Sequence, residues 1–231
     1  YLFTGTRGTG KTTCAKILAR AVNCEHPVNG DPCNECAACR GILDGSVLDV
    51  TEIDAASNNG VDNIRDLRDE TRYTPAQVRK RVFIIDEVHM LSIGAFNALL
   101  KTLEESPEHV LFILATTELP KVPATILSRC QRFDFRRIGA EDISRRLLDV
   151  AAGEGIALTE GAARLIARLA DGAMRDALSM LDRAAAAGAV DEKTVTAALG
   201  VMGQDDGIRL AEHLKTGDLA AAGGLLDGYY N

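Results

Sequence analysis

The residues whose types and spacing best suit chemistry stand at the start of the chain. Residues 5–12 read Gly-Thr-Arg-Gly-Thr-Gly-Lys-Thr, the G-x-x-x-x-G-K-[ST] spacing of a phosphate-binding loop. Glycines allow several backbone N–H groups to point at one phosphate, and a helix beginning after the loop adds partial positive charge. Lys11 can reach the β- and γ-phosphates, and the Thr12 hydroxyl can bind Mg²⁺. The alternative is a glycine-rich turn ahead of a helix. The pattern predicts an ATP site formed by Gly5, Thr6, Arg7, Gly8, Thr9, Gly10, Lys11, Thr12 and Thr13.

A second set of candidate residues ends the apolar run at 81–87. A strand that is apolar on both faces is typical of a buried parallel sheet, and ligands bind at the carboxyl ends of such strands. Here the run ends in Asp86 and Glu87. Downstream of a phosphate-binding loop, this arrangement predicts that Asp86 orients Mg²⁺ and that Glu87 polarises the attacking water. We expect the neighbouring His89 to pack or to form a hydrogen bond rather than to act in catalysis.

The elements that must position these groups alternate between strands and helices. Strands are predicted at 1–4, 46–54, 81–87, 110–115 and 131–135, and helices at 13–21, 61–71, 93–103 and 125–130. The strand at 110–115 leads into polar residues that can sense the γ-phosphate. The helix after Ser92 is predicted to bury an apolar stripe of Ile93, Phe96, Leu99, Leu100 and Leu103. Arg65 and Arg68 form either a solvated face or contacts to a DNA backbone.

Four of the six cysteines fall within one short window after the first helix. Cys24, Cys33, Cys36 and Cys39 follow the pattern C-x₈-C-x₂-C-x₂-C, in which each C-x₂-C step can aim two sulfurs at one ion. Four thiolates satisfy a tetrahedral Zn²⁺ and leave no open position, so the pattern predicts a structural zinc site. Free buried cysteines and two disulfides are the alternatives.

Composition bounds the class of protein. The 231 residues are 46% hydrophobic and 26% charged, with a net charge of -7, which argues against coating nucleic acid by bulk electrostatics but allows a few phosphate contacts. No apolar run approaches the ~18 residues of a membrane span, so we expect no membrane partner. A P-loop ATPase is expected in the cytosol, where disulfides are rare. The chain opens inside a predicted strand without a methionine, so we expect it to be part of a longer protein.

The second part of the chain has a different pattern of residues. After Gly139 no strand pattern remains, and four helices are predicted near 141–153, 159–171, 175–187 and 191–199. Two further helical segments follow residue 204 and are too short to form their own core. We therefore predict an ATPase core at 1–138 with a cysteine knuckle at 24–39, a helical domain at 139–203, and the start of a third domain at 204–231.

Several motifs together resemble one family. They are the phosphate-binding loop, the four cysteines, I-I-D-E-V-H-M-L, L-A-T-T-E, L-S-R-C and G-A-M-R-D-A-L. The combination is similar to the tau/gamma subunits of bacterial DNA polymerase III, the AAA+ ATPase motors of its clamp loader. The resemblance implies an α/β domain with a five-stranded parallel sheet, a helical lid and a helical collar that assembles a pentamer. The family's adenine-contacting segment before the loop and most of the collar have no counterpart in this sequence.

The resemblance also implies roles for three further residues. Arg129 would be an arginine finger that acts in trans on ATP bound by a neighbouring subunit, which makes hydrolysis depend on assembly. Thr117 would sense the γ-phosphate, and Arg175 would be a second sensor that reaches the phosphates from the lid.

The implied function is that of a nucleoid-associated motor using ATP, Mg²⁺ and structural Zn²⁺. Its implied partners are other clamp-loader subunits in a hetero-pentamer, the sliding clamp and the backbone of primed DNA. A non-hydrolysing stator of the same fold and another AAA+ DNA remodeller are the alternatives. The intact Lys11, Glu87 and Arg129 speak against the stator, and the four cysteines speak against the remodeller.

Overall fold

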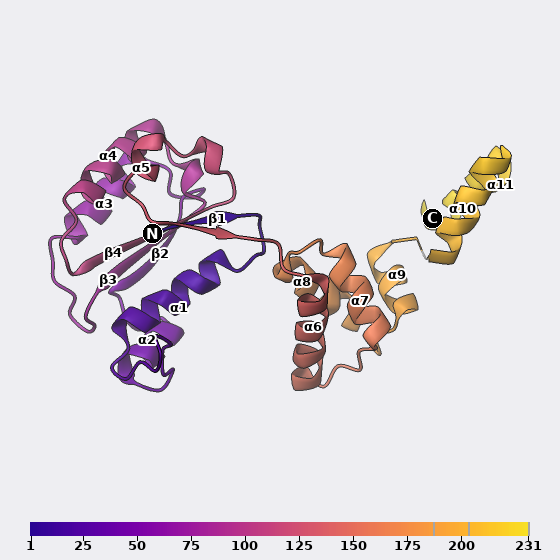
Figure 1. Cartoon of the computed structure of the whole chain (residues 1–231), viewed down its shortest axis with the longest axis horizontal. Coiled ribbons are helices and arrows are strands. Elements are labelled where there is room, and N and C mark those ends of the chain that lie inside the picture. Colours follow the sequence, from indigo (N-terminus) through magenta and orange to yellow (C-terminus); the bar gives the residue numbers. More distant parts are fainter. Residues whose placement is uncertain (187, 203, 231) are drawn as a thin grey trace. The chain divides into compact units, whose positions relative to one another are not determined.

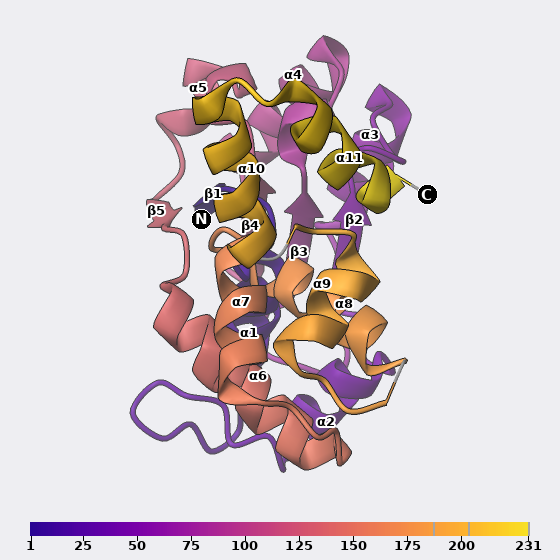
Figure 2. The ribbon, with the colours of Figure 1, turned by 90° about the vertical axis from the view of Figure 1, so that its right-hand side faces the viewer.

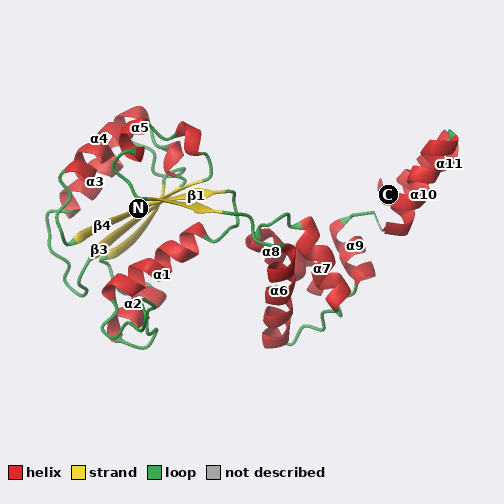
Figure 3. Cartoon of the chain, viewed as in Figure 1, coloured by secondary structure: helices red, strands yellow, loops and turns green. Residues whose placement is uncertain are grey.

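The computed structural model describes residues 1–186, 188–202 and 204–230. Contacts within the chain group it into two compact units, Tyr1–Arg136 and Arg137–Asn231. Strands occur in the first unit, whereas the described elements of the second unit are helices (Figure 3). Residues 187, 203 and 231, which end the predicted third lid helix, the predicted lid and the predicted collar segment, lie outside the described residues.

Five parallel strands form the sheet of the first unit, in the order β2-β3-β4-β1-β5 (Figure 1). The α/β fold with a five-stranded parallel sheet, predicted from the sequence, is therefore confirmed. Because every strand runs the same way, the carboxyl ends of all five meet at one edge of the sheet. The strands are β1 (Leu2–Gly5), β2 (Val50–Asp54), β3 (Arg81–Asp86), β4 (Val110–Thr116) and β5 (Arg132–Phe135).

Helices cover both faces of this sheet. One face carries α1 (Lys11–Asn23), and α2 (Ala37–Asp44) packs against α1. The other carries α3 (Val61–Glu70), α4 (Ile93–Glu104) and α5 (Ala124–Leu127), as Figure 1 shows. Side chains alternate along a strand, so β3 buries Val82 and Ile84 in the core under α1, and Phe83 and Ile85 in the core under α3 and α4. This double burial explains why the run is apolar on both faces.

Two buried polar side chains fix the point at which β3 begins. Asn23, at the end of α1, receives a hydrogen bond from the Lys80 N–H at 2.7 Å and donates to the Lys80 carbonyl at 3.0 Å. The Asp49 carboxylate pairs with Arg81 at 2.7 Å and accepts the backbone N–H groups of Ala76 and Gln77, each at 2.9 Å. Both contacts hold the strand whose far end carries Asp86.

The structure differs from the sequence predictions in several local features. The strand predicted at 46–54 forms only at Val50–Asp54, because Asp49 turns inward to Arg81 while Leu48 is exposed. Ile93 was wrongly placed in the buried stripe of its helix, since it is the first residue of α4 and is 83% exposed. The helix α2 was missed, because the cysteine window was interpreted only as a metal-binding loop.

In the described part of the second unit, four helices share a core, seen from another side in Figure 2. These are α6 (Ala140–Glu154), α7 (Glu160–Leu169), α8 (Met174–Ala185) and α9 (Glu192–Leu199). Small residues such as Ala163, Ala167 and Ala177 are buried between them. Two further helices, α10 (Gln204–Thr216) and α11 (Leu219–Tyr230), pack against each other. Among the described residues, no helix combines the length and the apolar character needed to cross a membrane.

Candidate active site and metal centre

The loop between β1 and α1 has a backbone that requires glycine. Gly5 has φ +145°, and a Cβ atom built there would lie 2.3 Å from the carbonyl oxygen of Phe135 on β5. Gly10 has φ +91° and precedes Lys11, the first residue of α1. No side chain caps α1, so the N–H groups of its first turn face the loop. Backbone donors at a helix N-terminus are the ordinary protein ligands of a phosphate.

Lys11 is buried within this loop. Its ammonium group donates hydrogen bonds to the carbonyl oxygens of Gly5 at 2.9 Å and Thr6 at 3.0 Å. Burial lowers the pKa of Lys11, while the negative charges of Glu87 and Asp86 act in the opposite direction. The loop thus holds the Lys11 ammonium group at its centre, and the Glu87 and Asp86 carboxylates are close enough to stabilise its positive charge.

The Thr12 hydroxyl and Asp86 are brought together at the carboxyl edge of the sheet. Thr12 Oγ1 donates to Asp86 Oδ2 at 2.7 Å, and the other carboxylate oxygen accepts the Glu87 N–H at 2.8 Å. Mg²⁺ prefers oxygen ligands and binds through one or two protein groups together with substrate phosphates and water. The neighbouring hydroxyl and carboxylate oxygens of Thr12 and Asp86 therefore fit a magnesium ion at this position.

Glu87 and Thr117 also lie together, although 30 residues separate them in the chain. Glu87 Oε2 accepts the Thr117 backbone N–H at 3.2 Å and the Thr117 hydroxyl at 2.8 Å. The contact forms because β3 and β4 are neighbours in the sheet and both end here. Glu87 has φ 47° and ψ 45°, an uncommon conformation for a non-glycine residue, and such conformations cluster at active sites.

The two arginines are placed differently. Arg129 forms an ion pair with Glu104 and donates to the Thr125 carbonyl at 3.2 Å and the Ser128 hydroxyl at 3.1 Å. Arg175 is exposed in the first turn of α8, in the second unit. Neither Arg7 nor Thr13 is buried in the loop, since both side chains are exposed.

The four cysteines form a second centre. The Sγ atoms of Cys24, Cys33, Cys36 and Cys39 all lie within 4.8 Å of one another, and those of Cys33 and Cys39 are 4.0 Å apart. A tetrahedral zinc with Zn–S bonds of about 2.3 Å requires sulfur separations of about 3.8 Å. The cluster is therefore close to the geometry that a Cys₄ zinc site requires.

Backbone groups around the cluster suit bound thiolates. The N–H groups of Cys33 and Cys36 donate to Cys24 Sγ and Cys33 Sγ, each at 3.3 Å, and the Cys39 N–H donates to Cys36 Sγ at 3.4 Å. The Cys33 N–H lowers the pKa of the Cys24 thiol. Burial raises the pKa of Cys39 to about 12, so a cation is needed to hold that sulfur as a thiolate.

Sequence reasoning missed Glu104, which pairs with Arg129. This contact depends on which helices become neighbours, so no local pattern signals it. Thr116 and Glu118 belong to the polar end that was predicted after the strand at 110–115, and Glu118 N–H donates to Thr116 Oγ1 at 3.1 Å. His89 was expected to pack or to form a hydrogen bond, and its Nδ1 lies 3.0 Å from Thr116 Oγ1.

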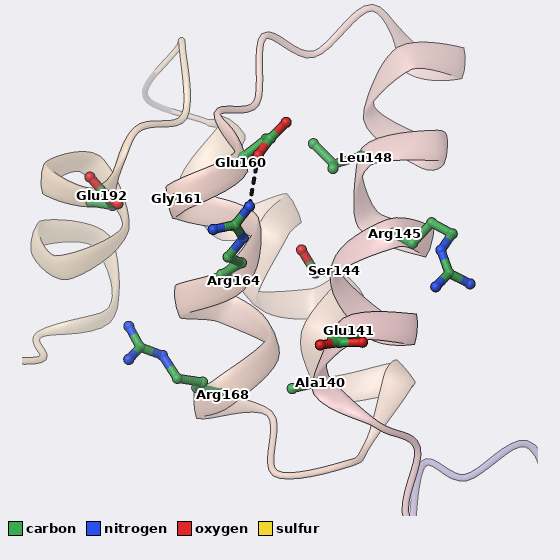
Figure 4. A pocket seen from close by; sticks show the side chains of 10 residues that line it. All are labelled: Ala140, Glu141, Ser144, Arg145, Leu148, Glu160, Gly161, Arg164, Arg168 and Glu192. Atoms are coloured by element: carbon green, nitrogen blue, oxygen red, sulfur yellow. Dashed lines mark hydrogen bonds and ion pairs between the residues drawn. The ribbon is translucent and has the colours of Figure 1, made fainter.

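A cavity of about 750 Å³ lies between α6, α7 and α9 of the second unit (Figure 4). Its lining carries equal numbers of acidic and basic side chains, and Arg164 forms an ion pair with Glu160 at 2.8 Å along α7. None of the residues predicted for nucleotide or metal chemistry lines this cavity. Its balanced charge gives it no preference for an anion or a cation.

Strand order, phosphate-binding loop and the acidic pair that ends β3 together define a P-loop nucleoside-triphosphatase domain of the AAA+ class. A family model described as "DNA polymerase III, delta subunit" matches residues 1–139, and one described as "DNA polymerase III clamp loader subunit, ATPase lid domain" matches residues 142–190. The chain belongs to the DNA polymerase III clamp-loader family, with subunits of the tau/gamma type as relatives.

Two of these relatives are proteins named DNA polymerase III subunit tau. The one from Bacillus subtilis is 64% identical over 184 residues, which are 80% of this chain and 33% of the relative. The one from Escherichia coli is 49% identical over 214 residues, which are 92% of this chain and 33% of the relative. The chain thus spans about a third of the length of these relatives.

A solved structure supports the assignment of the fold. The RuvB Holliday junction branch migration motor of Thermotoga maritima matches with a TM-score of 0.61 at 16% identity, over 97% of this chain and 73% of that one. At this identity, the likeness concerns the fold alone.

Proposed function

We propose that this chain is the ATP-hydrolysing motor region of a bacterial replicative clamp loader. It would act in the cytoplasm at the nucleoid, in a hetero-pentamer that opens the sliding clamp and loads it on primed DNA. The observation that carries this proposal is the contact of Glu87 with Thr117 beside the Thr12–Asp86 pair. A non-hydrolysing stator has no need for this complete set of groups.

The roles of the loop residues follow from their chemistry. ATP phosphates bind to the backbone N–H groups of residues 5–13 and to the ammonium group of Lys11, which turns from the carbonyls of Gly5 and Thr6 toward the nucleotide. Thr12 and Asp86 hold Mg²⁺, which neutralises charge on the phosphates. Glu87 polarises the attacking water, and Thr117 orients Glu87 and contacts the γ-phosphate.

Two arginines complete the proposed machinery. Arg129 acts in trans on the ATP of a neighbouring subunit, for which it must leave its contact with Glu104. Arg175 acts from the lid on the phosphates of its own subunit. Positive charge from both stabilises the transition state of phosphoryl transfer.

The four cysteines hold a structural zinc in this proposal. Their sulfurs have nearly the required separations, and all four positions of the ion are filled by protein. The zinc therefore stabilises the segment 24–39 and takes no part in hydrolysis.

The domain organisation remains part of the proposal. An ATPase core at 1–138 is followed by a lid at 139–203 and by the start of a collar at 204–231. The grouping of contacts on either side of Arg136 supports the first boundary. Contacts to DNA would be few and directed to its backbone, with Arg65, which is exposed and pairs with Asp62 at 2.9 Å, as a candidate.

The test uses the full-length chain reconstituted with its partner subunits, the sliding clamp and primed DNA. Glu87→Gln should bind ATP as tightly as the wild type and lose turnover by about 100- to 10,000-fold. Lys11→Ala is the binding control and should lose ATP affinity. Unchanged turnover in Glu87→Gln would refute the role of that residue. A wild type that neither binds nor hydrolyses ATP would favour the stator.

A further inference from the structure

His89 has surroundings that a packing residue does not need. It lies in η1 (Val88–Met90), a short 3₁₀ turn that follows Glu87 directly and packs against β4. The left-handed conformation of Glu87 turns the chain back over the end of that strand. The His89 side chain is only 5% exposed there, so its ring is held in one place.

Both nitrogens of the ring face polar groups. Nδ1 lies 3.0 Å from Thr116 Oγ1 and 3.3 Å from Glu87 Oε2, while Nε2 lies 3.4 Å from Glu118 Oε1. The Thr116 hydroxyl is fixed in turn, because its oxygen accepts the Glu118 N–H at 3.1 Å.

These contacts converge on the oxygen atom of Glu87 that Thr117 also binds. Glu87 Oε2 accepts hydrogen bonds from the Thr117 N–H and the Thr117 hydroxyl, and His89 Nδ1 lies 3.3 Å from the same oxygen, within ion-pair distance. The Thr117 hydroxyl would turn toward a bound γ-phosphate in the proposed mechanism. When the Thr117 hydroxyl leaves Glu87 for the phosphate, His89 remains beside the Glu87 carboxylate and holds its orientation.

We propose that His89 is a positioning residue for Glu87: its Nδ1 edge orients the carboxylate that polarises water, and its Nε2 edge is anchored on Glu118. Glu118 is itself held by Lys121 at 2.9 Å, so the anchor does not depend on His89. The inference rests on the proposed function, because it concerns the residue that activates water. It assigns His89 to the chemical step and not to nucleotide binding, since the polar contacts described for its ring are with Thr116, Glu87 and Glu118, which lie outside the phosphate-binding loop.

The ring offers a matched set of variants. Asparagine puts an amide near the position of Nδ1, whereas glutamine extends one close to Nε2. His89→Asn can therefore keep the contact with Glu87, and His89→Gln keeps only the contact with Glu118. His89→Ala removes both. A fall in the unfolding temperature or in zinc content would report general damage in any of them.

The experiment measures steady-state ATP hydrolysis and ATP affinity of the full-length chain in the reconstituted clamp loader, with sliding clamp and primed DNA. For His89→Ala and His89→Gln, kcat should fall about 10- to 100-fold, as expected for a misplaced catalytic group, while the affinity for ATP stays unchanged. His89→Asn should recover most of kcat. In a Glu87→Gln background, His89→Ala should cause no further loss, because the two residues act as one unit.

Three outcomes overturn the inference. The first is a His89→Ala variant with wild-type kcat. The second is an equal loss in all three variants together with a lower unfolding temperature, which indicates a structural role. The third is a full additional loss in the Glu87→Gln background. In each case a wild type that hydrolyses ATP leaves the proposed function intact, whereas a wild type without turnover removes both.

Discussion

The buried contact between Asp49 and Arg81 should contribute more to stability than any exposed ion pair of the first unit. The Asp49 side chain is 4% exposed and that of Arg81 16%. Asp49 accepts hydrogen bonds from Ala76 N–H, Gln77 N–H and two nitrogens of Arg81. Removing one partner of a buried pair costs about 3–5 kcal/mol, because the other charge is left without compensation. We therefore expect Asp49→Ala to lower the free energy of unfolding by about that amount.

The assay is urea unfolding followed by far-ultraviolet circular dichroism, since the chain has no tryptophan. Asp69→Ala is the matched control, because Asp69 pairs with Arg68 at 3.3 Å on an exposed helix face and should change the free energy of unfolding by less than about 1 kcal/mol. Equal effects of Asp49→Ala and Asp69→Ala would show that the buried pair stabilises the fold no more than an exposed one.

The same contact predicts a pH dependence. Burial alone would raise the pKa of Asp49, but the hydrogen bonds from Gln77, Arg81 and Ala76 outweigh it and hold this pKa below its usual value. The folded state therefore binds the proton less readily than the unfolded state. The stabilisation is present above the unfolded pKa of about 3.9 and is lost as the pH falls through the folded value. The difference between wild type and Asp49→Ala should narrow below about pH 4, and a constant difference would contradict this.

Two further predictions concern the metal centre and the finger. Wild-type protein purified without chelator should contain one zinc per chain by metal analysis. Cys36→Ser should lose the zinc, whereas the control Cys14→Ser, which lies outside the cluster, should keep it. Much less than one zinc per chain in the wild type would exclude the site. Arg129→Ala should keep ATP binding in its own subunit and lose hydrolysis by the assembly, whereas Glu104→Gln should leave hydrolysis unchanged or raise it by at most about fivefold, because a partly exposed ion pair contributes about 1 kcal/mol or less. Equal losses in both finger variants, measured as ATP turnover of the reconstituted assembly, would mean that Glu104 belongs to the active arrangement.

The sequence predicted the features that depend on local chemistry. Position 5 requires glycine because its φ is positive and because a Cβ atom there would clash with the Phe135 carbonyl. The spacing of Gly10, Lys11 and Thr12 follows from the start of α1 at Lys11. The apolar run before Asp86 predicted a buried strand, because a strand that is covered on both faces has no position for a polar side chain. The cysteine spacing likewise specifies a cluster before any fold is known.

The features that the sequence did not reveal depend on neighbours in space. His89 meets Glu118, and Glu104 meets Arg129, only because of where β3, β4, α4 and α5 lie in the sheet unit. Leu48 and Ile93 carried an apolar signal, but Leu48 precedes β2 and Ile93 is the first residue of α4, and both are exposed. Asp49 looked like part of a strand, yet its burial is offset by Arg81, a partner 32 residues away.

In the proposed function, ATP turnover by this chain drives clamp loading. The most direct measurement is ATP hydrolysis by the full-length chain, reconstituted with candidate clamp-loader subunits, with and without the sliding clamp and primed DNA. We expect a large stimulation that needs both the clamp and the DNA, and that disappears in Arg129→Ala. Turnover that is indifferent to clamp and DNA would contradict the claim, and would leave a P-loop ATPase that acts on some other partner.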